Sequence, residues 1–140
     1  MAGSIGVMFR RKHLPVELRD AHDAFTGQVE RLEAARSALM SCLPVGRVDP
    51  APVAVGLDLL ADTLAELEAE LSAWRVPTVE EEWRGCVAAI AETRAHMHRA
   101  YEAAATTTEL EELLGAVEDV DEPLGHAFGQ AERRWRMLRR

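Results

Sequence analysis

The feature that most constrains the fold is an apolar repeat in the middle of the chain. Its members alternate four and three residues apart, as in the seam of a coiled coil: Val53, Leu57, Leu60, Leu64, Leu67, Leu71 and Trp74. Acidic residues fall outside the repeat, at Asp58, Asp62, Glu66, Glu68 and Glu70. The pattern predicts one long helix with a buried stripe and an acidic face. Such a helix is stable only when other helices cover the stripe.

Three further segments repeat apolar side chains at helical steps, and no stretch alternates apolar and polar residues as a strand would. The four predicted helices are residues 16–42, 50–74, 78–105 and 108–139. With 140 residues, the chain is about the size of one domain. We therefore predict an all-α, up-down-up-down four-helix bundle over residues 13–140, preceded by a flexible basic tail at residues 1–12.

A helix-start signal stands before each of the last three predicted helices. Asp and Thr cap a helix by accepting a backbone hydrogen bond, and a glutamate three residues later completes a capping box. The pairs are Asp49 with Pro50, Thr78 with Glu81, and Thr108 with Glu111. Inside the last helix, Pro123 removes one backbone hydrogen bond, so we expect a kink near residues 119–122. A break into five helices is the structural alternative.

Charge and composition argue against several classes of function. The net charge of -8 disfavours nucleic-acid binding. The chain has no phosphate-binding loop, no paired catalytic spacing and no apolar run long enough to cross a bilayer. Cys42 and Cys86 form no CxxC pattern, which fits a reducing cytoplasm. We expect a non-catalytic cytoplasmic protein without a cofactor.

Four residues of types that bind metals or move protons lie close together in the sequence, at Glu92, His96, His98 and Glu102. Positions four apart share a helix face, so Glu92 pairs with His96 on one face and His98 pairs with Glu102 on another. Such pairs are common on helix surfaces. His126 lies at a similar height on the last predicted helix. The alternative function is therefore a small-ligand- or metal-binding bundle that uses Glu92, His96 and His126. His22, in the seam of the first helix, is a candidate for a pH-responsive core.

One end of the predicted bundle differs from the rest. In an antiparallel arrangement, all three tryptophans and most of the basic residues meet there. We count 11 basic and 7 acidic residues at this end, against 5 and 17 elsewhere. The residues expected to contact a partner are Arg133, Arg134, Trp135, Arg136, Arg139, Arg140, Trp74 and Trp83.

Two interpretations of this end remain open. Bases favour helix ends and tryptophans plug the open end of a bundle, which accounts for the pattern without any function. The functional interpretation is an interaction protein that uses the basic, Trp-containing end and the acidic helix face. The expected partner is an unidentified protein, with a homodimer as one form of contact. An anionic membrane surface is a further possibility, because tryptophan beside arginine suits that interface.

Overall fold

The computed structural model describes residues 13–45 and 49–139. Within these ranges every regular element is helical, which confirms the predicted all-α fold. The long helices are α2 (Arg19–Ser41), α3 (Ala51–Glu70), α4 (Glu80–Thr106) and α5 (Leu110–Met137). Three short 3-10 helices accompany them, η1 (Val16–Leu18), η2 (Leu71–Trp74) and η3 (Pro77–Val79). The predicted tail, residues 1–12, and Arg140 lie outside the described residues.

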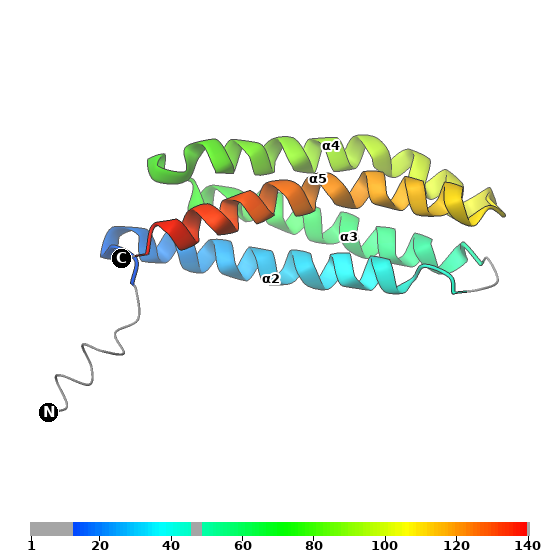
Figure 1. Ribbon diagram of the computed structural model, residues 1–140, viewed down its shortest axis with the longest axis horizontal. Helices are drawn as coiled ribbons and strands as arrows, with labels where there is room; N and C mark the ends of the chain where they lie inside the picture. The colour runs from blue at the N-terminus through cyan, green and yellow to red at the C-terminus, as the bar shows by residue number, and fades with distance from the viewer. Residues whose placement is uncertain (1–12, 46–48, 140) are drawn as a thin grey trace, which may run out of the picture.

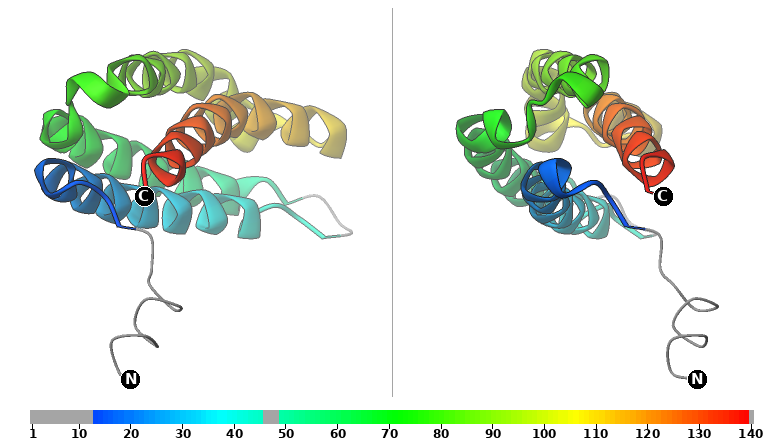
Figure 2. Two further views of the ribbon diagram at one scale, coloured as in Figure 1. Left: turned by 60° about the vertical axis from the view of Figure 1, so that its left-hand side comes forward. Right: turned by 90° about the vertical axis from the view of Figure 1, so that its left-hand side faces the viewer.

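The four long helices lie side by side, and successive helices run in opposite directions (Figure 1). In the end-on view they surround a common core (Figure 2). Each helix packs on the next one in the chain, and the contact between α4 and α5 is the most extensive. The contact between α2 and α5, which closes the ring, is the slightest of the four.

The core is one connected cluster of buried apolar side chains. Every residue of the repeat from Val53 to Trp74 is at most 6% exposed, which confirms the predicted stripe. At the start of α5, Leu113 is fully buried, whereas Leu110 and Leu114 are only partly covered.

α2 and α3 approach closely at a glycine. A Cβ atom at Gly56 would lie 3.0 Å from the Cα of Leu39. Toward the other end of this seam, Gln28 is buried, and its Nε2 donates to the carbonyl of Glu70 at 2.9 Å. The Oε1 of Gln28 accepts a hydrogen bond from Nε1 of Trp74, also at 2.9 Å. Close packing and a fully used amide hold this seam together.

α2 and α5 are joined by two kinds of contact, an ion pair and aromatic packing. Arg36 makes a bidentate ion pair with Asp121, with Nε to Oδ1 at 2.7 Å and Nη2 to Oδ2 at 3.0 Å. These hydrogen bonds raise the pKa of Arg36. A Cβ atom at Gly125 would lie 2.5 Å from Nη2 of Arg36, so the glycine makes room for the guanidinium. Nearer the chain ends, Phe25 packs on Trp135 with ring centroids 6.1 Å apart.

The helix starts agree with the predictions at one of three positions. The side chain of Asp49 accepts a hydrogen bond from the backbone of Ala51, 3.2 Å, as predicted for α3. The predicted capping box at Thr78 is wrong, because that threonine lies inside η3 and α4 begins after it without a side-chain cap. At α5 the N-cap position is Glu109 and has no side-chain cap, so the predicted box at Thr108 is wrong; the hydroxyl of Thr107 instead accepts a hydrogen bond from the backbone of Glu109.

α5 continues without a break from Leu110 to Met137 and so contains Pro123. The five-helix alternative is therefore wrong. The predicted helices 16–42, 50–74 and 78–105 each include a short stretch that is 3-10 in the structure. Such tighter turns are common at helix ends, where backbone groups lack intrahelical partners.

Candidate contact surface at the basic end

The three tryptophans do meet at one end, but two of them are core residues. Trp74 is 0% and Trp135 is 2% exposed. Both pack on Phe25, with ring centroids 4.8 Å and 6.1 Å away. The prediction that Trp74 and Trp135 contact a partner must be corrected, because their large rings fill the end of the core. Trp83, by contrast, is only partly buried.

Trp83 lies at the start of α4 and is held from two sides. Its Nε1 donates to the carbonyl of Leu71 at 2.8 Å, at the point where α3 gives way to η2. The guanidinium carbon of Arg75 lies 4.2 Å from the centre of the indole ring, in a cation–π contact. Trp83 is therefore the tryptophan of this end whose ring forms part of the surface.

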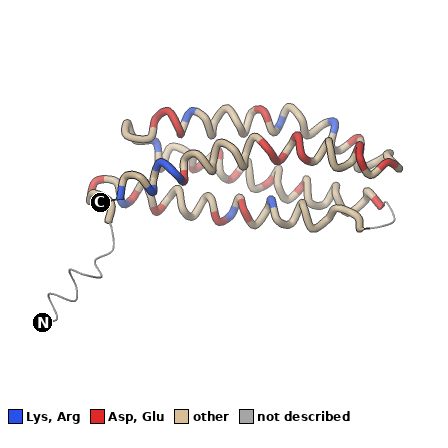
Figure 3. The backbone as a smooth tube through the Cα atoms, in the orientation of Figure 1, with Lys and Arg blue, Asp and Glu red and all other residues tan. Residues whose placement is uncertain are grey.

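Arginines gather at the end of α5: Arg133, Arg134 and Arg136 lie on its last two turns, and Arg139 follows the helix. Figure 3 shows basic residues concentrated in this part of α5, beside the C-terminus. Arg133, Arg136 and Arg139 are exposed, and Arg134 is partly buried. Basic side chains in the last turn also interact favourably with the negative end of the helix dipole.

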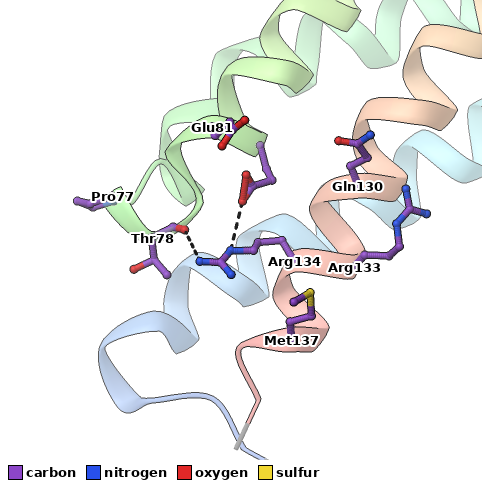
Figure 4. A pocket seen from close by; sticks show the side chains of 8 residues that line it. Pro77, Thr78, Glu81, Gln130, Arg133, Arg134 and Met137 are labelled. Carbon is purple, nitrogen blue, oxygen red and sulfur yellow. Dashed lines mark hydrogen bonds and ion pairs between the residues drawn. The ribbon is translucent and has the colours of Figure 1, made fainter.

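Arg134 is engaged within the molecule. It reaches from α5 to the start of α4, with Nε 3.4 Å from Oε1 of Glu82 and Nη2 3.5 Å from the carbonyl of Thr78 (Figure 4). Arg133 makes no ion pair with any residue in the described ranges and extends away from Thr78 in the same view. We therefore assign Arg134 to holding the two helices together and Arg133 to the open surface.

Between η3, the start of α4 and the end of α5 lies an open cleft of about 550 Å³. Its lining consists of Pro77, Thr78, Glu81, Glu82, Gln130, Arg133, Arg134 and Met137 (Figure 4). Met137 is 74% exposed, an unusual position for a large apolar side chain. The sequence analysis missed this residue. The sequence does contain a feature that points to Met137: it is an apolar residue outside the buried stripe, one helical turn after two arginines.

Arg136 and Arg139 lie on the α2 side of the same turns. Nη2 of Arg136 is 4.0 Å from Oε2 of Glu132, and Nη2 of Arg139 is 3.5 Å from Nε2 of His22. A second groove of about 350 Å³ runs between α2 and α5 here. Burial, and then the charge of Arg139, lower the pKa of His22. His22 is only partly buried and lies against the edge of Trp135.

The charge difference between the two ends is present in the described chain, but the basic end is neutral there. Its described arginines are Arg19, Arg75, Arg84, Arg133, Arg134, Arg136 and Arg139, and its acids are Glu17, Asp20, Asp23, Glu80, Glu81, Glu82 and Glu132. The remaining described chain has 4 arginines and 17 acids. The predicted excess of four positive charges thus rests on Arg10, Arg11, Lys12 and Arg140, outside the described residues.

The acidic face of α3 is largely engaged by neighbouring helices. Arg31 of α2 pairs with Glu66 and Glu70. Arg94 of α4 lies 2.6 Å from Oε1 of Glu68. Farther along, the hydroxyl of Tyr101 donates to Asp58 at 2.6 Å, and burial together with this contact raises the tyrosine pKa to about 12. These exposed contacts join α3 to its neighbours and contribute little stability individually.

The residues of the alternative site do not gather. Glu92 and His126 line one shallow groove between α4 and α5, about 380 Å³, but His96 does not reach it. In the described ranges, no three His, Cys, Asp or Glu side chains lie close enough to hold a metal ion. His98 pairs with Glu102 at 3.0 Å, as the helix spacing predicts for a surface contact. The residues present do not form a metal-binding set.

The buried thiol of Cys86 offers no nucleophile. Burial, and secondarily the charge of Glu82, raise its pKa to about 12, so the thiol stays protonated near neutral pH.

Comparison with protein families, curated proteins and solved structures finds no match to this chain. None of the described helices combines the length and the apolar character that a bilayer-spanning segment requires.

Proposed function

We propose that this protein is an interaction module that binds acidic segments of a partner protein through the end of α5. The binding surface, called here the α5 terminal surface, consists of Arg133, Arg136, Met137 and Arg139. The observation that carries the proposal is that all four side chains are exposed at the end of α5 and directly after it, with Met137 at 74%. An exposed apolar side chain with arginines on both sides of the same helix end suits a peptide that combines an apolar side chain with carboxylates.

A protein partner fits this surface better than a nucleic acid or a membrane. Three glutamates, Glu81, Glu82 and Glu132, border the arginines and would repel a continuous run of phosphates. A peptide places its carboxylates one at a time, and arginine binds each of them in a bidentate fork. A single exposed methionine is also a small apolar area for insertion between lipids.

A second copy of the chain is one acidic partner to consider. The far part of the described molecule carries 13 more acidic than basic residues, so head-to-tail contact between copies would be electrostatically favourable. The free thiols of Cys42 and Cys86 also support our placement of the protein in a reducing cytoplasm.

The test measures binding of a fluorescent peptide that alternates glutamate with leucine, using the full chain at low and high salt. The variant carries Arg133→Glu, Arg136→Glu and Arg139→Glu. We expect affinity to fall at least about tenfold, or roughly 1.4 kcal/mol, and to weaken in high salt for the unchanged protein. The matched control is Arg99→Glu, an exposed arginine paired with Asp119 far from this surface, which should bind normally.

Equal binding by the triple variant and the unchanged protein would overturn the proposal. Vesicles of phosphatidylserine and of phosphatidylcholine form the second arm. Binding to the anionic vesicles without binding to the peptide would replace the protein partner with a membrane. Sedimentation of the protein alone shows whether the triple variant loses a salt-sensitive self-association, which would identify the second copy as the partner.

A further inference from the structure

A larger groove lies on the other side of α4, against α3 and η2. It encloses about 640 Å³, within the range of roughly 300–1,000 Å³ typical of small-molecule sites. Its floor and walls are mostly apolar, formed by Leu71, Trp83, Val87, Ile90 and Ala91. Arg75, Arg94, Glu68 and Ser72 complete the lining. None of these residues belongs to the α5 terminal surface, so the groove is a separate feature.

Small residues from η2 and α4 line this groove. α3 ends at Glu70 and the chain tightens into the 3-10 turn η2. Ser72 on that turn and Ala91 on α4 leave space that longer side chains would fill. From Trp83 to Arg94, the α4 wall extends over about 16 Å at 1.5 Å per residue. The space is therefore elongated along α4.

Trp83 provides a fixed aromatic wall. Its hydrogen bond to the carbonyl of Leu71 fixes the orientation of the indole, and Arg75 covers part of the ring. Arg75 is itself held by Glu80, through Nη2 to Oε1 at 2.8 Å and through Nε. A rigid ring loses little conformational entropy when a ligand packs on it.

The polar groups of the groove favour an anion at the Trp83 end. Glu68 is paired one-to-one with Arg94. Glu80, in contrast, is shared by Arg75 and Arg84, at 2.8 Å and 3.3 Å. Glu80 and Arg84 do not line the groove, so the charged group that faces a ligand at this end is Arg75. Glu80 engages Nε and Nη2 of Arg75, while Nη1 of Arg75 has no hydrogen-bond partner in the described ranges and can donate to a second carboxylate.

We propose that this groove binds a carboxylic acid with an apolar body, such as a medium-chain fatty acid. The carboxylate pairs with Arg75 at the Trp83 end, and the chain lies along Leu71, Val87 and Ile90. The match is in both shape and charge: an elongated apolar channel with one edge of a guanidinium open to a ligand at its end. Guanidinium binds carboxylate through paired, charge-assisted hydrogen bonds.

Octanoate, with neutral octanamide as its matched analogue, is the probe. Titration of the full chain is followed by tryptophan fluorescence and by calorimetry. We expect octanoate to bind and to change the emission of Trp83, whereas the buried Trp74 and Trp135 respond little. Octanamide should bind at least about tenfold more weakly. Equal affinity for octanoate and octanamide would overturn the anionic assignment.

Two variants locate the site. Val87→Glu places a carboxylate in the groove at a residue that is 38% exposed, and we expect octanoate affinity to fall at least about tenfold. Val55→Glu is the matched control, since Val55 is an exposed helical valine outside the groove. Thermal melting verifies that both variants are folded. The groove is not a carboxylic-acid site if Val87→Glu binds octanoate as tightly as the unchanged protein does, or if neither protein binds it. Because no lining residue is shared, these results are independent of peptide binding at α5.

Discussion

The two seams on either side of α2 are built by different means. Between α2 and α3, Gly56 permits close backbone approach and Gln28 satisfies both the indole of Trp74 and a backbone carbonyl. Between α2 and α5, the helices make much less contact, and an ion pair and aromatic packing bridge them. The indole Nε1 of Trp135 is buried there and has no hydrogen-bond partner among the residues that the structure describes. One seam is tightly packed with its buried polar groups paired, and the other is looser.

This difference has consequences for stability and for function. A buried polar group without a partner costs about 1–3 kcal/mol. The α2–α5 seam therefore adds less to the stability of the fold than the buried apolar area of its aromatic rings would suggest. Local opening begins where packing is weakest. We therefore expect the end of α5, which carries the proposed binding surface, to open before the α2–α3 pair does.

The largest expected effect comes from the polar network of the tight seam. Gln28→Leu removes the partner of Trp74 Nε1 and of the Glu70 carbonyl at once. Leaving a buried indole donor and a partly buried carbonyl without partners should cost about 3 kcal/mol in the free energy of unfolding, measured by urea denaturation. The double variant with Trp74→Phe should recover part of this loss, because the orphaned indole donor is then gone. A loss below about 1 kcal/mol would show that the network is not what distinguishes this seam.

The second effect compares one arginine at each seam. Arg36 and Asp121 have side chains 20% and 16% exposed, whereas those of Arg31, Glu66 and Glu70 are 42%, 62% and 51% exposed. Arg36→Met should cost about 2 kcal/mol because it leaves a partly buried carboxylate unpaired. Arg31→Met should cost less than about 1 kcal/mol, as for exposed pairs. Equal losses in the two variants would mean that solvent screens both pairs alike.

The contrast between the seams could be predicted only in part from the sequence. The heptad spacing was sufficient to predict the buried stripe of α3, because apolar periodicity depends on local helix geometry alone. The partner of Asp121 was not predictable: Arg36 lies 85 positions away, and its neighbour Gly125 becomes meaningful only once α2 and α5 face each other. Pairings across a bundle depend on the relative rotation of helices, which spacing within one helix does not determine.

The candidate site, too, was predictable from the sequence only in part. The sequence predicted that the tryptophans and arginines meet at one end, because chain direction alone brings them together. The apolar repeat placed Trp74 in the buried stripe of α3, yet spacing alone did not show that burial removes Trp74 and Trp135 from the contact surface. Nor did it predict the groove beside Trp83, which is lined by residues of α3, η2 and α4 and depends on how these elements pack together.

The third prediction compares the two buried indoles directly. Trp74→Phe and Trp135→Phe remove similar volumes from the same end of the core. The first also leaves Oε1 of Gln28 without its donor, whereas the second removes a donor that has no acceptor. We expect Trp74→Phe to be more destabilising by about 1–2 kcal/mol in matched urea denaturation curves. A Trp135→Phe loss equal to or larger than that of Trp74→Phe would show that Trp135 has a partner in solution.

The smallest effect is a pH dependence confined to the looser seam. Burial and Arg139 lower the pKa of His22 below 6.5, despite the opposing charge of Asp23. Glu30, Glu132 and Arg136 also line the groove that contains His22. Because the folded state binds this proton more weakly than the unfolded state does, the His22 contribution is complete above pH 6.5 and declines as pH falls below it. Below pH 6.5, the protection of backbone amides against exchange, corrected for the intrinsic exchange rate at each pH, should fall more at the end of α5 than at the end of α3. His22→Leu should remove that difference, and its persistence in the variant would assign the change to the carboxylates instead.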